Sequence, residues 1–152
     1  MTNGIAKILK SKHIIPFMMS KSQHDLKVLM NDKLPGKSEI YKLISLSGGF
    51  ASVSFIKYVA EKENILELTA STLRIGEKQF YYIEKLSEQG KLKKASFFIG
   101  SLMKTDKDKD KDKYDYFTKF EKCCEKNKWD TTVANNHSKI VLMRTAKNYF
   151  VL

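Results

Sequence analysis

The chain has 152 residues, 42% of them hydrophobic, and its 28 Lys and Arg against 17 Asp and Glu give a formal net charge of +11. This length predicts one globular domain with its own core and is too short for two ordinary domains. No stretch approaches the roughly 18 consecutive apolar residues of a membrane-spanning helix, and the first residues show no secretory signal, so we expect a cytoplasmic protein with no membrane partner.

The first 36 residues contain two short apolar clusters and end at Pro35-Gly36. They carry no motif that indicates chemistry. We predict that residues 1–36 form an N-terminal extension, which packs through these clusters on a main domain of residues 37–152.

The main domain begins with a strand-like run at residues 40–44, followed by a Ser-Gly-Gly turn at residues 47–49. Apolar side chains then recur at three-residue spacing at Val53, Ile56 and Val59. This spacing predicts a helix that lays one apolar face on a sheet.

Strands and helices then alternate along the chain. Residues 65–71 and 94–100 are strand-like, and residues 77–89 form an amphipathic pattern that Gly90 is well placed to end. This order predicts an α/β fold with a mixed, mainly parallel central sheet flanked by helices. Ser71 then lies at the carboxyl end of a strand, where α/β proteins bind ligands.

Residues 104–113 alternate Lys and Asp, which predicts a mobile, solvated loop. The spacing of Asp106, Asp108 and Asp110 imitates the start of a calcium loop. The positions that such a loop needs for Gly and for the final Glu hold Lys111 and Phe117 instead, so we exclude calcium.

A third helix is predicted by aromatic residues at helical spacing from residue 114 to residue 124. Cys123 and Cys124 are adjacent, which fits neither a disulfide framework nor a zinc knuckle, and we expect one core thiol and one surface thiol. The three histidines are scattered along the chain. We therefore predict no metal and no cofactor.

The last part of the chain carries the residues that indicate chemistry. Strands are predicted at residues 131–134, 140–143 and 148–152, and His137-Ser138-Lys139 precedes the second of them. Because side chains two apart on a strand share a face, we expect His137 and Lys139 to point the same way. A neutral imidazole can attack phosphorus, and an ammonium group beside it can neutralise the phosphate.

The segment from Asn135 to Met143, with the elements before it, resembles the His-x-Lys half-motif of the phospholipase D superfamily, which includes lipases, nucleases and nuclease-like proteins of bacteria and phages. The resemblance covers roughly residues 40–152. It implies that His137 is a nucleophile, that Lys139 binds the phosphate, and that no metal is required.

The chain departs from the family pattern at two places. The pattern places Asp where this chain has Arg144, and its Gly-Ser or Gly-Gly segment with a following Asn would lie beyond Leu152. We therefore expect a chain that is cut short after an apolar strand and is weakly active or inactive.

Two functions follow from these residues. The first is a phosphodiesterase of the nuclease type acting on DNA or RNA through a phosphohistidine at His137, with Asn136, Arg144 and Ser71 at the substrate. Since the motif occurs once, the resemblance implies a homodimer in which each His137 serves the other copy's leaving group. The second is a non-catalytic nucleic-acid-binding or interaction module on the same scaffold, in which Lys139, Arg144 and Lys147 contact backbone phosphates. The sequence also leaves open a small structural protein without a ligand, which would show no salt-dependent affinity for DNA.

Overall fold

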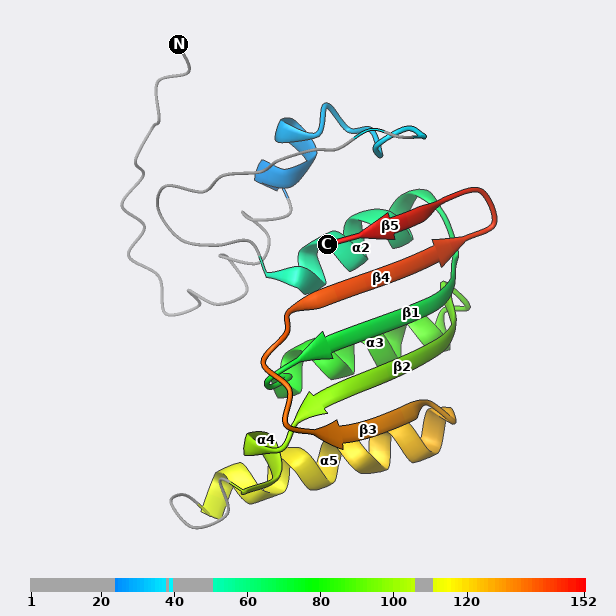
Figure 1. Cartoon of the computed structure of the whole chain (residues 1–152). Coiled ribbons are helices and arrows are strands. Elements are labelled where there is room, and N and C mark those ends of the chain that lie inside the picture. The colour runs from blue at the N-terminus through cyan, green and yellow to red at the C-terminus, as the bar shows by residue number, and fades with distance from the viewer. Residues whose placement is uncertain (1–23, 38, 40–50, 106–110) are drawn as a thin grey trace, which may run out of the picture.

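The computed structural model describes residues 24–37, 39, 51–105 and 111–152 of the chain (Figure 1). The predicted strand at residues 40–44 and its glycine turn lie outside this part. The described elements, in chain order, are α2 (Ser52–Lys62), β1 (Ile65–Thr72), α3 (Glu77–Glu88), β2 (Leu92–Gly100), α4 (Leu102–Thr105), α5 (Lys111–Asn127), β3 (Asp130–Ala134), β4 (Ile140–Thr145) and β5 (Tyr149–Val151).

The five strands form one sheet in the order β3-β2-β1-β4-β5. β1 pairs parallel with β2, and β2 pairs parallel with β3, whereas β4 runs antiparallel to both β1 and β5. The prediction of an α/β fold is confirmed, but the prediction of a mainly parallel sheet is wrong. The physical reason is the short connection from β3 to β4, which carries no helix and returns the chain in the opposite direction.

Helices α2, α3 and α5 lie behind the sheet on one of its faces (Figure 1). The residues that face them are buried, among them Ile65 and Leu68 of β1 and Phe97 and Ile99 of β2. The β1-α3-β2 and β2-α5-β3 connections are both right-handed crossovers, and both move across the sheet in the same direction. Helices α3 and α5 therefore lie on the same face. In the described part of the chain no helix covers the opposite face, so the flanking helices that we predicted lie on one face only there.

The apolar patterns of the helices account for their burial. Val53, Ile56 and Val59 of α2 are buried as predicted, as are Phe80, Ile83 and Leu86 of α3. Gly90 follows α3 with φ of +70°, a left-handed conformation that glycine adopts without a Cβ clash. Phe120 of α5 packs edge-on against Phe80 and Phe97, which ties both helices to β2.

Residues 24–29 form a short helix that packs on α2. Leu26 and Met30 are buried against Tyr58, and the Tyr58 hydroxyl donates a hydrogen bond of 2.9 Å to the Lys33 carbonyl. This part of the predicted N-terminal extension therefore contacts the main domain.

The Lys- and Asp-rich segment is helical at both of its ends. Lys104 lies in α4 and α5 begins at Lys111, so the predicted loop is wrong there, while residues 106–110 lie outside the described part. Alternating Lys and Asp allow helix formation when a packed helix such as α5 continues the segment, because tertiary contacts outweigh local composition.

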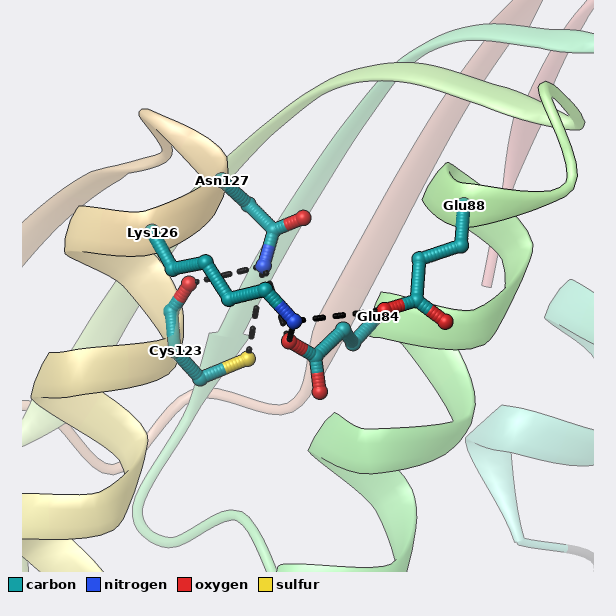
Figure 2. A network of polar contacts seen from close by, with 5 residues as sticks. All are labelled: Glu84, Glu88, Cys123, Lys126 and Asn127. Atoms are coloured by element: carbon teal, nitrogen blue, oxygen red, sulfur yellow. Dashed lines mark hydrogen bonds and ion pairs between the residues drawn. The ribbon is translucent and has the colours of Figure 1, made fainter.

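A polar network joins the carboxyl-terminal parts of α3 and α5 (Figure 2). Lys126 Nζ lies 2.9 Å from Glu84 Oε1 and 3.2 Å from Glu88 Oε1, and Asn127 Nδ2 donates to the Cys123 carbonyl at 2.9 Å. The hydrogen bond from Lys126 lowers the pKa of Glu84. These contacts join two helices, so we assign the network a structural role.

Both cysteines are buried, so the expectation of one surface thiol is wrong. Burial raises the pKa of Cys123 to about 12 and also raises the pKa of Cys124. A raised thiol pKa leaves little thiolate, which is the reactive form.

We predict that both thiols react with iodoacetamide at pH 8 at least about tenfold more slowly in the native protein than in urea. Mass spectrometry of the alkylated peptides measures this ratio. Equal rates in the two states would show that the thiols are not held in the core.

Candidate functional site

The carboxyl ends of β1, β2 and β3 meet at one end of the sheet, and the β3-β4 connection crosses that end (Figure 1). This connection spans residues 135–139 and contains His137 and Lys139. Because β4 is antiparallel to β1, it enters the sheet from the same end. The carboxyl ends of β1, β2 and β3 and the amino end of β4 therefore lie together at this end of the sheet.

Asn136 ties the connection to two strands. Its Nδ2 donates hydrogen bonds to Ser71 Oγ of β1 at 2.8 Å and to the Phe98 carbonyl of β2 at 3.0 Å. Its Oδ1 accepts from the backbone N–H of Ser138 at 2.9 Å and from the Ser138 hydroxyl at 2.7 Å. The amide thereby makes four hydrogen bonds, which is its full capacity.

The two serines complete a ring with Asn136. The hydroxyls of Ser71 and Ser138 are hydrogen-bonded to each other. Since Asn136 donates to Ser71 and Ser138 donates to Asn136, the remaining proton of Ser71 is directed to Ser138. Each of the three groups therefore both donates and accepts, and residues on either side of His137 are fixed.

Gly100 at the end of β2 fits closely under this connection. A Cβ at this position would lie 2.8 Å from the carbonyl oxygens of both Asn136 and Leu73. Such a separation is far inside van der Waals contact, so only glycine lets the loop after β1 and the β3-β4 connection approach β2 this closely.

His137 lies between the two fixed residues and is exposed. Within the described part of the chain, no hydrogen bond or ion pair engages its imidazole. His137 and Lys139 lie in the connection before β4, which begins at Ile140, so the strand alternation from which we predicted that they share a face does not apply to them. The connection remains irregular because Asn136 bonds to side chains and to a carbonyl instead of joining a strand ladder.

Lys139 lines a pocket of about 220 Å³ on the helix side of the sheet. The pocket is also lined by Ser71, Thr72 and Arg74, by the start of α2, and by Gly76 and Gln79 at the start of α3, and most of its other lining residues are apolar. The N-cap residues of these two helices, Ala51 and Gly76, make no side-chain capping hydrogen bond. Uncapped helix N-termini present N–H groups that favour anions. His137 is not among the described residues that line this pocket.

The surroundings of the connection are basic. The segments 69–76, 96–105 and 131–139 contain Arg74, Lys104, His137 and Lys139 but no Asp or Glu. The first carboxylate after segment 69–76 belongs to Glu77, at the start of α3. Its Oε1 lies 3.3 Å from Lys119 Nζ. These three segments therefore carry positive charge with no carboxylate of their own.

Arg144 lies elsewhere. It occupies the far part of β4, where its Nη2 is 2.8 Å from Glu67 Oε1 and its Nε donates to Glu67 Oε2 at 3.0 Å. This two-point contact lowers the pKa of Glu67. The structure therefore brings Ser71, Asn136, His137 and Lys139 to one end of the sheet and leaves Arg144 near the other.

A larger pocket, of about 660 Å³, runs along β5 and the start of the described chain. Its lining is mainly apolar, including Phe55, Tyr58 and Phe150, and it does not include the β3-β4 connection. Its lining also includes Lys37, Lys147 and Asn148, but none of the residues that the sequence motif singles out.

The described residues contain neither a cluster of metal-ligating side chains nor a membrane-spanning helix. No group of three or more His, Cys, Asp or Glu side chains is placed there to hold a metal ion. No helix in this part of the chain combines the length and the apolar character needed to cross a bilayer.

Comparison of the chain with protein-family models, with curated proteins and with solved structures finds no match. The resemblance to the phospholipase D superfamily therefore stays a prediction from the motif.

Sequence reasoning missed Ser138 and Gly100. Ser138 lies inside the motif, but only its contact with Ser71 reveals its role. Gly100 ends an apolar strand, where a glycine ordinarily marks a turn, and the close approach of two carbonyls becomes visible only in three dimensions.

We predict that Asn136→Ala lowers the free energy of unfolding by about 1 to 3 kcal/mol, because the partners of a filled amide lose their hydrogen bonds. Asn135→Ala is the matched control: Asn135 is the exposed neighbour, and no hydrogen bond from the described residues engages its side chain. It should change stability by less than about 0.5 kcal/mol. Urea denaturation measures both, and equal losses would contradict the role of the ring.

Proposed function

We propose that the carboxyl end of the sheet binds phosphodiesters and that the chain is a phosphodiesterase-like domain of the phospholipase D type. The observation that carries this proposal is the ring of Ser71, Asn136 and Ser138, which holds the connection in place and leaves the His137 imidazole exposed. A side chain presented in this way between two fixed neighbours is suited to nucleophilic attack.

Lys139 supplies the electrostatic half of the site. The pocket that it lines also receives Arg74 and the uncapped N-termini of α2 and α3. Phosphate oxygens placed there would meet an ammonium group and backbone N–H groups, and both stabilise developing negative charge.

The reaction would follow in two steps. An imidazole nitrogen of His137 attacks phosphorus, the bond from phosphorus to the leaving oxygen breaks, and that oxygen takes a proton from an acid. Water then attacks the phosphohistidine, which returns the imidazole and releases the phosphate monoester. His24, the other histidine in the described residues, lies in the short N-terminal helix, so a second copy of the chain is our candidate source of the acid.

Nucleic acid is the substrate that charge favours. The net charge of +11 and the basic end of the sheet attract a polyanion, and Lys contacts with phosphates release condensed counterions. Affinity should therefore fall as salt rises. Arg144 is engaged by Glu67, so we no longer include it among the residues that bind substrate directly.

The second candidate, a non-catalytic nucleic-acid-binding module, is favoured by one observation. In the described part of the chain no carboxylate orients His137, and catalytic imidazoles commonly depend on such a partner. The pocket beside Lys139, which Arg74 also lines, would serve this function equally well.

His137→Asn distinguishes the two candidates. We expect it to abolish hydrolysis of bis(4-nitrophenyl) phosphate while leaving oligonucleotide affinity within about twofold, because the nucleophile is lost and the cations are retained. His24→Asn is the control and should retain full activity. In wild-type protein, an alkali-stable, acid-labile phosphate on the peptide containing His137 would identify the intermediate.

If wild-type protein binds oligonucleotides but neither hydrolyses the ester nor forms this adduct, the non-catalytic function is supported instead. If it neither binds nor hydrolyses, both candidates fail.

Lys139→Ala should weaken binding of an oligonucleotide about 3- to 30-fold at low salt and flatten the dependence of affinity on salt, because one phosphate contact is lost. Lys93→Ala is the control, since Lys93 is an exposed lysine near the opposite end of the sheet. Fluorescence anisotropy over a range of salt concentrations measures both variants. Identical salt slopes for the two would contradict a phosphate role for Lys139.

A further inference from the structure

The pocket of about 660 Å³ lies beside β5, at the opposite edge of the sheet from β3 (Figure 1). Its volume falls within the roughly 300 to 1,000 Å³ of pockets that bind small molecules. The described residues that line it come from three parts of the chain: the segment 30–39, helix α2, and the β4-β5 hairpin with the residue that follows it. A ligand placed there would therefore contact elements that are far apart in the sequence.

The buried part of this lining is apolar. It consists of buried or half-buried side chains from all three parts of the chain, among them Leu34, Phe55, Val59, Met143 and Phe150. Tyr58 also lines the pocket, but its hydroxyl donates to the Lys33 carbonyl at 2.9 Å. An apolar ligand can therefore cover this wall without leaving the Tyr58 hydroxyl unpaired.

The cations of the lining lie at its exposed part. Lys37 and Lys147 are exposed, and no hydrogen bond or ion pair from the described residues engages either ammonium group. Two other polar side chains of the lining are already engaged. Glu39 Oε2 accepts from the Gly36 N–H at 2.6 Å, and Asn148 Nδ2 donates at 3.1 Å to the carboxylate of the residue that follows α2. A ligand would therefore meet an apolar wall inside and two available positive charges outside.

We propose that this pocket binds a single-chain fatty acid, with its hydrocarbon chain against the apolar wall and its carboxylate at Lys37 and Lys147. Charge complementarity selects this ligand, because an uncharged chain would leave both ammonium groups unused and a cationic one would be repelled by them. No described residue lines both this pocket and the pocket beside Lys139. The proposal is therefore independent of the proposed phosphodiesterase function.

Equilibrium dialysis of wild-type protein against decanoate tests the proposal, and octanoate and decylammonium serve as comparison ligands. We expect decanoate to bind about 5- to 15-fold more tightly than octanoate, because each buried methylene contributes up to about fourfold in affinity. Decylammonium has a chain of the same length with the opposite charge, and it should bind at least about tenfold more weakly than decanoate.

The double variant Lys37→Gln with Lys147→Gln removes the two cations of the pocket. It should weaken decanoate binding about 3- to 30-fold, the range expected for two exposed ion pairs. The ratio of decanoate to octanoate affinity should stay as in wild type, since the apolar wall is unchanged. Lys93→Gln with Lys122→Gln is the matched control, because it removes the same charge from exposed lysines of β2 and α5 that do not line the pocket. This control should bind like wild type.

Leu34→Trp tests the apolar part, because the larger side chain occupies space that the hydrocarbon chain needs. It should weaken both fatty acids at least about fivefold. Leu29→Trp is its control, since Leu29 is 55% exposed and does not line the pocket. Thermal unfolding shows whether each variant folds. If Leu34→Trp does not fold, the chain-length ratio and the lysine variants still decide the question.

An absence of decanoate binding by wild-type protein would overturn the proposal and leave a protein segment as the occupant of the pocket. Equal affinities for decanoate and octanoate would overturn the placement of the chain. Equal affinities for decanoate and decylammonium, or equal losses in the two lysine double variants, would overturn the placement of the carboxylate. Hydrolysis of bis(4-nitrophenyl) phosphate, measured separately, reports on the other site.

Discussion

The arrangement at the end of the sheet depends on a single side-chain amide. Asn136 uses all four of its hydrogen-bonding positions, two toward β1 and β2 and two toward Ser138. Without it, an irregular connection with exposed backbone would cross three strand ends, and such segments sample many conformations. With it, the backbone on both sides of His137 is held, while the imidazole itself remains exposed to solvent.

The mixed sheet explains why this amide can reach so many partners. In a fully parallel sheet the chain would leave β3 and cross to the other end through a helix before its next strand. Here β4 runs back antiparallel to β1, so the connection stays at the end where β1, β2 and β3 terminate. The sheet direction that we predicted wrongly is therefore the feature that brings Ser71 within reach of residues 65 positions later.

Much of the described fold follows from the sequence, because the helices and strands there have clear apolar periods. The buried positions of α2 and α3 follow the spacing of Val53, Ile56, Phe80 and Ile83. The sequence did not predict the direction of β4 or the helical ends of the Lys- and Asp-rich segment. Both depend on tertiary contacts with other elements of the fold. For the site, the motif drew attention to His137 and Lys139. Their irregular backbone and the engagement of Arg144 by Glu67 depend on contacts between residues far apart in the chain.

Because α2, α3 and α5 all lie on one face of the sheet, the strand residues that form the core and those that face solvent are different sets. The core lies between the sheet and α2, α3 and α5, so the side chains that set stability alternate along each strand with side chains that do not. Residues such as Phe98, Ile140 and Leu142 point away from that core. Substituting these residues changes the chemistry of the surface and has little effect on the free energy of folding. The protein could therefore acquire new ligands on this face during evolution while its core stays the same.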